Sequence, residues 1–240
     1  MFTTALSVTI GAILSVSGVA SGNGDKPAKF TVRVENITKQ DAFTASNGMK
    51  WSLALSPGAA VVHTNKVPIF TSEKKDRGLG LEAQSEDGDP GMLAKSLKRE
   101  KGIKSVTVFN APVGASAPGP ITPGAAYEFT VSAMPGERLS ITLMMGQSND
   151  WFYASPESGI ELFQNGKAIS GDITSQLAMW DAGTETDQEP GIGPDQGPRQ
   201  KAPNTGKAEN GVVRKVQDGK PYSKPSEVMR VTITPAMSPM

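Results

Sequence analysis

Two aspartates stand at the ends of apolar segments, and a glutamate follows the second of them closely. Asp150 comes shortly after the apolar run 139–145, and Asp181 comes directly after the residues LAMW at 177–180. Glu185 lies four residues beyond Asp181, and the intervening AGT can turn tightly enough to direct both carboxylates inward. The same turn can offer backbone carbonyl oxygens beside them. These three acids are therefore the first candidates for a chemical site.

Three carboxylates held close together repel one another unless a cation lies between them. Two like charges about 4 Å apart cost about 4 kcal/mol at an effective dielectric constant of about 20. Ca²⁺ binds about six to eight oxygen atoms, and flexible loops supply them readily. The spacing of Asp150, Asp181 and Glu185 is therefore compatible with a calcium site. The same acids also fit a second interpretation, in which they are ordinary solvated loop residues.

The acids can meet only if the strands that precede them end at one edge of a sheet. We expect the segment 159–163 to form an antiparallel return strand between those two strands. Strands separated by one antiparallel neighbour run the same way and end at the same edge. Asp150 and Asp181 would then lie together at that edge.

Alternation of apolar and polar residues predicts about eight short β-strands separated by Gly, Pro, Asn or Asp. The first strand is expected near 30–36, where Phe30, Val32 and Val34 share one face. Further candidates, from which the remaining strands are expected, are 51–55, 60–62, 67–71, 103–109, 127–133, 139–145, 159–163, 177–180 and 228–234. The pattern predicts an all-β fold, an antiparallel β-sandwich that spans residues 28–235 as one domain.

Only one short helix is expected. Asp89 can cap it, Pro90 suits its first turn, and the residues MLAKSLKRE continue to Gly102. Two long loops rich in proline and glycine, residues 110–124 and 186–210, interrupt the strand pattern. A loop as long as the second is uncommon inside a compact domain, so it is either functional or an error in the assignment of strands.

Residues 1–20, MFTTALSVTIGAILSVSGVA, are typical of a signal peptide. They carry no charge and are mostly apolar from Ala5 onward, and polar residues follow. Serine, threonine and glycine dilute the apolar run, which makes it a poor membrane span. Small residues at 18–20 predict cleavage after Ala20, so the mature chain would begin at Ser21, carry no membrane span and be secreted or periplasmic. An uncleaved membrane anchor is the alternative.

The composition excludes several kinds of chemistry. The chain has no cysteine, which excludes disulfides, a thiol nucleophile and thiolate-bound metals. It has one histidine, His63, so a zinc site with several imidazoles is impossible, and we expect this side chain to be packed or hydrogen-bonded. The phosphate-binding GxxxxGK[ST], the hydrolase GxSxG and the metalloprotease HExxH motifs are missing from the sequence.

The overall charge is balanced, with 24 Lys and Arg against 24 Asp and Glu. Nucleic-acid binding requires a basic excess to neutralise phosphates, so we expect no nucleic-acid partner. One basic run stands out, and we expect it to be the solvated face of a helix and its exit. The alternative is a patch that recognises phosphorylated or sulfated glycan. Its members are Lys95, Lys98, Arg99, Lys101 and Lys104.

The chain resembles the spondin amino-terminal domain in its bacterial form. The resemblance runs from about Lys29 to Pro235, and SxDW and WDAGTE are its most specific parts. Two further stretches are similar to the same family, SPG–VVH at 56–63 and EDGDP at 86–90. The remaining similar strings are QSNDWFYASPESGIELF, GDIT, LAMWDAGTE, PGIGPDQGPRQ, PNTG and VTITP.

The resemblance implies a C2-like sandwich that holds one Ca²⁺ ion with Asp150, Asp181 and Glu185. Glu185 departs from the family pattern, which typically has aspartate there. Because the animal relatives bind matrix and cell surfaces, the resemblance implies a non-enzymatic adhesion or recognition module. Its partner would be an envelope or extracellular glycan or a surface protein. Two alternatives stay open: a glycan hydrolase that uses Asp150 with Asp181 or Glu185, and a purely structural envelope domain.

Overall fold

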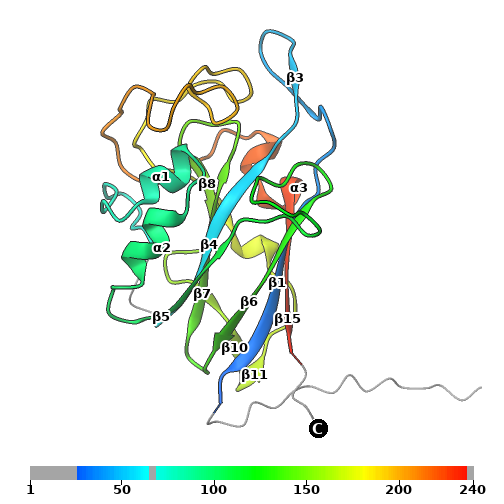
Figure 1. Ribbon diagram of the computed structural model, residues 1–240, viewed down its shortest axis with the longest axis vertical. Helices are drawn as coiled ribbons and strands as arrows, with labels where there is room; N and C mark the ends of the chain where they lie inside the picture. The colour runs from blue at the N-terminus through cyan, green and yellow to red at the C-terminus, as the bar shows by residue number, and fades with distance from the viewer. Residues whose placement is uncertain (1–25, 65–68, 237–240) are drawn as a thin grey trace, which may run out of the picture.

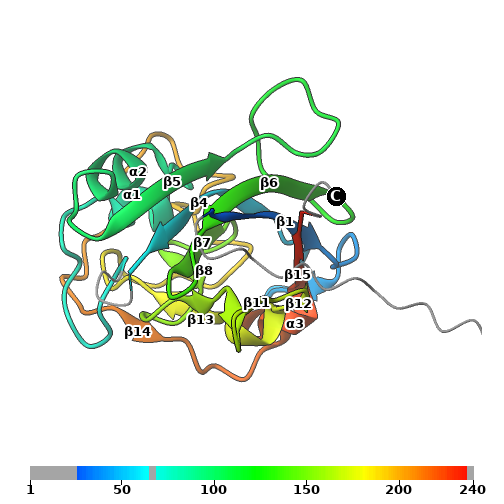
Figure 2. The same ribbon diagram turned by 90° about the horizontal axis from the view of Figure 1, so that it is seen from below.

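Two antiparallel sheets packed face to face form the body of the protein, which confirms the predicted all-β class (Figures 1 and 2). The computed structural model describes residues 26–64 and 69–236. The predicted signal segment, residues 1–20, lies outside the described residues. None of the described helices has the length and hydrophobicity that crossing a membrane requires.

The smaller sheet contains four strands, and the first and last long strands of the chain pair at its centre. Phe30 lies opposite Pro235 and Asn36 opposite Met229, so the terminal strands are both part of the sandwich, as predicted. The strand order is β12 (Gly171–Asp172), β15 (Met229–Pro235), β1 (Ala28–Asn36) and β6 (Ala126–Ala133).

The larger sheet contains seven strands. Its main path is β14 (Arg214–Lys215), β13 (Ala178–Asp181), β8 (Trp151–Ala154), β7 (Arg138–Met145), β4 (Leu55–His63) and β5 (Ile103–Phe109). A short strand, β9 (Ile160–Glu161), also pairs with β7. Two small hairpins stand apart, β2 (Phe43–Thr44) with β3 (Lys50–Trp51), and β10 (Phe163–Gln164) with β11 (Lys167–Ala168).

Two short helices, α1 (Leu81–Glu86) and α2 (Gly91–Leu97), cover the outer face of the larger sheet (Figure 1). Helix α2 is the predicted one, and the Asp89 carboxylate accepts the Gly91 N–H at 2.8 Å. Helix α1 was missed because its six residues are too few to show helical periodicity. One more helical turn, α3 (Pro225–Val228), and two 3₁₀ turns, Thr174–Gln176 and Pro221–Ser223, complete the helical segments of the described residues.

The larger sheet is apolar on both faces because it is the middle of three layers. Ala60 and Val62 of β4 point into the core between the sheets, whereas Ala59 and Val61 point toward α1 and α2. This alternation explains why the sequence at β4 is a continuous apolar run rather than a polar–apolar alternation.

Two of the strand predictions are wrong, one in where a strand ends and one in whether a strand forms. Ser56, Pro57 and Gly58, which were expected to end a strand, lie inside β4, where the pairing with β7 is irregular. The Ser56 hydroxyl accepts the Met144 N–H there at 2.8 Å, and a Cβ on Gly58 would clash with the Thr142 carbonyl oxygen. The strand expected at 67–71 is also wrong in its described part, because residues 69–71 form no strand, and residues 67–68 lie outside the described residues.

Replacing Ile233 by alanine should destabilise the protein by about 2–5 kcal/mol, because this buried residue of β15 lies in the core between the sheets. The control is Thr234→Ala, an exposed position on the same strand, which should change stability by less than about 1 kcal/mol. Urea unfolding of both variants measures the difference. Equal stabilities would contradict the placement of β15 in the core.

Candidate metal centre

Asp150 and Asp181 lie together because β8 begins at the same end of the sheet at which its antiparallel neighbour β13 finishes. Strand β8 begins directly after Asp150, and β13 ends at Asp181, with Trp151 opposite Asp181 in the register. The predicted return strand at 159–163 is therefore not what joins them, since β8 and β13 pair directly. The acids meet as expected, but through a strand that the sequence analysis missed.

The turn after β13 holds both aspartates through backbone N–H groups. The Gly183 N–H donates to the Asp181 carboxylate at 2.6 Å, and Gly183 has a positive φ of 67°. The Thr184 and Glu185 N–H groups donate to one oxygen of Asp150, Oδ2, at 2.8 and 3.0 Å. We had expected this turn to offer carbonyl oxygens. It instead offers donors that fix the Asp150 side chain.

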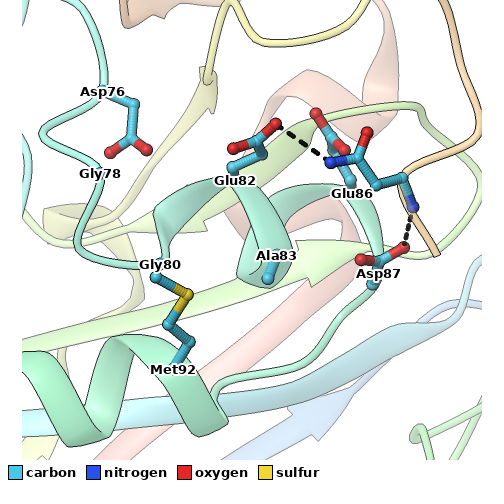
Figure 3. A pocket seen from close by; sticks show the side chains of 9 residues that line it. Asp76, Gly78, Gly80, Glu82, Ala83, Glu86, Asp87 and Met92 are labelled. Atoms are coloured by element: carbon cyan, nitrogen blue, oxygen red, sulfur yellow. Dashed lines mark hydrogen bonds between the residues drawn. The ribbon is translucent and has the colours of Figure 1, made fainter.

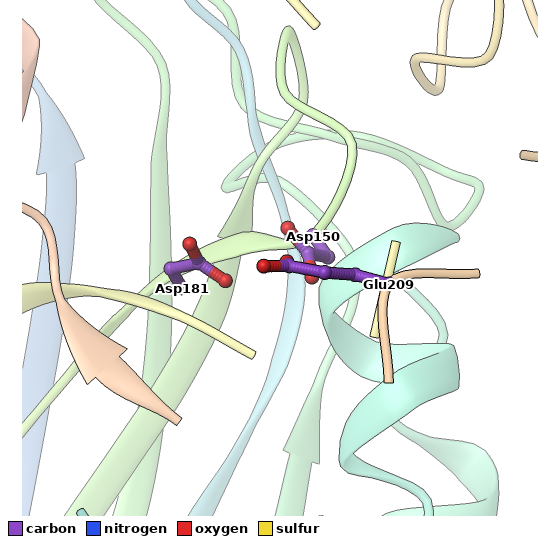
Figure 4. A group of neighbouring side chains, drawn as sticks. All are labelled: Asp150, Asp181 and Glu209. Carbon is purple, nitrogen blue, oxygen red and sulfur yellow. The ribbon is translucent and has the colours of Figure 1, made fainter. Parts of the chain in front are cut away.

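A third carboxylate, Glu209, completes the group. One oxygen from each of Asp150, Asp181 and Glu209 lies within 4.8 Å of the others, and Figure 4 shows Asp181 and Glu209 pointing toward Asp150 from two sides. Glu209 is held there by the chain around it, since its N–H donates to the Thr184 carbonyl at 2.9 Å. Three carboxylates in this arrangement can hold a metal ion.

The sequence analysis missed Glu209. It belongs to the loop 186–210, which was expected to be long and irregular and which contains neither a strand nor a helix. Nothing near Glu209 in the sequence marks it as a ligand, because only the folding of the loop brings it to β8 and β13. The length of the loop was the one available signal, since long irregular loops are often functional.

Glu185, the third predicted ligand, is buried but belongs to a different set of contacts. Its Oε2 accepts a hydrogen bond from the Asn149 side-chain amide at 2.8 Å, and the backbone of Gly206 contacts its carboxylate. It is not one of the three acids whose oxygens converge. Direct ligation by Glu185 stays a prediction, whereas its backbone N–H has a defined role in holding Asp150.

Burial makes the two aspartates unusually difficult to ionise. Asp150 is fully buried, and burial, with the charge of Asp181 as a smaller cause, raises its pKa to about 8. Burial and then Asp187 raise the pKa of Asp181 to about 6. The second oxygen of Asp150, Oδ1, is buried and has no hydrogen-bond partner. A buried polar atom without a partner costs free energy unless something outside the protein pairs with it.

A second acidic group surrounds a cavity of about 160 Å³ beside α1. Figure 3 shows Asp76, Glu82, Glu86 and Asp87 around it. Asn204 also lines the cavity, and it donates hydrogen bonds to Asp87 and Glu82. Glu86 connects this cavity to the group of Asp150, Asp181 and Glu209, because it is buried and its carboxyl contacts the Thr184 side chain.

The single histidine takes no part in either acidic group. His63 lies at the far end of β4, opposite Arg138, and is fully buried. Its two ring nitrogens lie 2.6 Å from the Thr64 carbonyl oxygen and 2.8 Å from the Ser140 hydroxyl. Burial lowers its pKa. These contacts confirm the expectation of a packed and hydrogen-bonded imidazole.

The basic run lies on the surface, as predicted. Lys95 and Lys98 are exposed on and just after α2, and Lys101 and Lys104 are exposed on the way into β5. Lys104 is half exposed and lies 3.7 Å from Glu137 in an ion pair.

No known protein family matches the chain, and no curated protein matches it. The site must therefore be interpreted from its own geometry. It offers oxygen ligands only, and two of its three acids are buried. Such a set suits a hard cation rather than one that prefers nitrogen or sulfur.

Glu86→Gln should stabilise the protein at high pH. Burial raises the pKa of Glu86 from its usual value of 4.5 to about 7, so the folded state binds this proton more tightly than the unfolded state. The free energy of unfolding therefore falls as the pH rises from about 4.5 to about 7, and the penalty is complete above that range. The variant should match the wild type at pH 4 and exceed it by on the order of 1–3 kcal/mol at pH 8.

Urea unfolding at several pH values measures this effect. The control is Glu227→Gln, which removes an exposed carboxylate from α3, away from Glu86, and should follow the wild-type profile. A Glu86→Gln variant that is no more stable than the wild type at pH 8 would show that Glu86 is ionised in the fold without penalty.

Proposed function

We propose that this protein is an exported, non-enzymatic calcium-binding module that serves adhesion or recognition. Two observations carry the proposal: oxygens of Asp150, Asp181 and Glu209 converge, and Asp150 has a buried oxygen that lacks a hydrogen-bond partner. A divalent cation at this point would neutralise the repulsion between the acids and satisfy that oxygen. Asp150, Asp181 and Glu209 are the residues that would hold it.

Calcium is the cation that this donor set fits best. Ca²⁺ accepts irregular sets of carboxylate and carbonyl oxygens from loops, whereas Mg²⁺ requires a nearly ideal octahedron of closer ligands. The three acids come from the start of β8, the end of β13 and an irregular loop. An arrangement built from three such different segments favours the more tolerant ion.

The spacing of the acids supports ion binding more than glycoside hydrolysis. A hydrolase needs two carboxyl groups about 5–10 Å apart with the sugar between them. Here the oxygens lie within 4.8 Å of one another, and Asp150 is fully buried. A buried acid cannot reach a polymeric substrate.

The argument for a recognition role comes from the resemblance to spondin amino-terminal domains, and the signal-like residues 1–20 support export.

Asp181→Asn should abolish most of the stabilisation that calcium gives. Ligand at a 100-fold excess over its Kd stabilises a folded protein by about 2.7 kcal/mol, which corresponds to about 5–10 °C for a domain of this size. Thermal unfolding of the chelated protein, with and without added Ca²⁺ or Mg²⁺, measures the shift. Asp172→Asn, on β12 of the other sheet, is the matched control and should keep the full calcium response.

A comparison of Glu209→Gln with Glu185→Gln identifies the third ligand. The geometry predicts that Glu209→Gln weakens Ca²⁺ binding at least tenfold, because it removes a converging charged oxygen. Glu185→Gln should weaken it less, since its carboxylate is bonded to Asn149 instead. Calorimetric titration gives both affinities. The reverse order would favour Glu185 as the direct ligand, as the family resemblance implies.

A further inference from the structure

One arginine stands among the acids of the metal centre. Strand β14 pairs with β13 at the sheet edge, and Arg214 lies directly opposite Asp181 in that register. Its guanidinium therefore reaches the three-acid group from the strand beside it. Arg214 is the only lysine or arginine of the described chain that forms an ion pair with any of these acids.

The guanidinium already occupies oxygens that a metal would use. Its Nη2 lies 2.6 Å from Asp181 Oδ2, and its two terminal nitrogens donate to both oxygens of Glu209 at 3.0 and 3.3 Å. The same Nη2 atom also lies 3.8 Å from Oδ2 of Asp187, an acid outside the group of three. Asp150 alone of the three converging acids receives no bond from Arg214, and its Oδ1 is the oxygen that lacks a partner.

Two of the three carboxylates are therefore partly neutralised before any ion arrives. Both oxygens of Glu209 accept hydrogen bonds from Arg214, whereas Asp181 accepts one from the Gly183 N–H and pairs its other oxygen with the guanidinium as an ion pair. A cation that takes one oxygen from each acid must weaken bonds to Arg214. It also comes close to a positive charge, and like charges at short range repel.

We propose that Arg214 is the resident counter-ion of this site and competes with the metal for Asp181 and Glu209. This inference rests on the proposed function, because it concerns the same ion. When the metal is absent, Arg214 compensates the acids and keeps the edge of the sheet stable. When the metal binds, the guanidinium releases its contacts with Asp181 and Glu209. With 38 % of its side chain exposed, Arg214 has solvent beside it into which it can turn.

Competition of this kind predicts opposite effects of one substitution. Arg214→Gln should lower the melting temperature of the chelated protein, because the acids lose their counter-charge. The same variant should bind Ca²⁺ more tightly, by about tenfold, since even in water a unit charge about 6 Å from a divalent ion costs about that factor. If the ion pair were purely structural, its removal would lower the melting temperature without raising the affinity for Ca²⁺.

The experiment is calorimetric titration of chelated protein with Ca²⁺, together with thermal unfolding of the same samples. Arg214→Lys keeps the charge and should bind Ca²⁺ about as the wild type does. Arg33→Gln is the matched control, because it removes the same charge from an exposed pair with Glu128 in the other sheet. Its calcium affinity should equal that of the wild type. If Arg214→Gln does not fold, Arg214→Met, which keeps an apolar stem, takes its place.

The outcomes separate this inference from the proposed function. If the wild type binds Ca²⁺ and Arg214→Gln binds it no more tightly, the inference fails and the calcium site stands. If only Arg214→Gln binds, competition is supported and the wild-type protein is not a calcium module. If neither protein binds Ca²⁺, both proposals are overturned.

Discussion

The direct pairing of β8 with β13 is the constraint on which the site depends. It places the start of one strand beside the end of the other, and so brings Asp150 and Asp181 to a single edge. It also decides which side chains face which layer, because Tyr153 and Met179 point between the sheets while Phe152 and Trp180 point toward the helices. A slip of one residue would exchange these faces and separate the acids.

Burying these acids lowers the stability of the folded protein, and the rest of the sandwich has to compensate for that loss. Placing Asp150 out of contact with water raises its pKa to about 8 and leaves one of its oxygens without a partner. The backbone N–H groups of Thr184 and Glu185 recover part of that cost. The large apolar core between the two sheets stabilises the fold enough to tolerate such a buried acidic group.

The sequence predicted those parts of the fold that show their pattern locally. The strands β5, β6 and β7 and the two terminal strands alternate clearly, and they lie where the alternation indicates. Strand β8 was missed because its residues WFYA are buried on both faces and show no alternation. Asp150 and Asp181 could be found because each follows an apolar segment of the sequence. Glu209 could not, because a folded loop rather than a nearby pattern brings it to the site.

The pairing of β1 with β15 has a consequence for how the protein is made. These strands come from opposite ends of the chain, and Phe30 lies opposite Pro235. The smaller sheet therefore cannot be completed until β15 has left the ribosome. Until then β1 has only β6 as a partner, and its other edge stays open. Such distant contacts make folding slow, so a growing chain would need protection from aggregation until its last strand arrives.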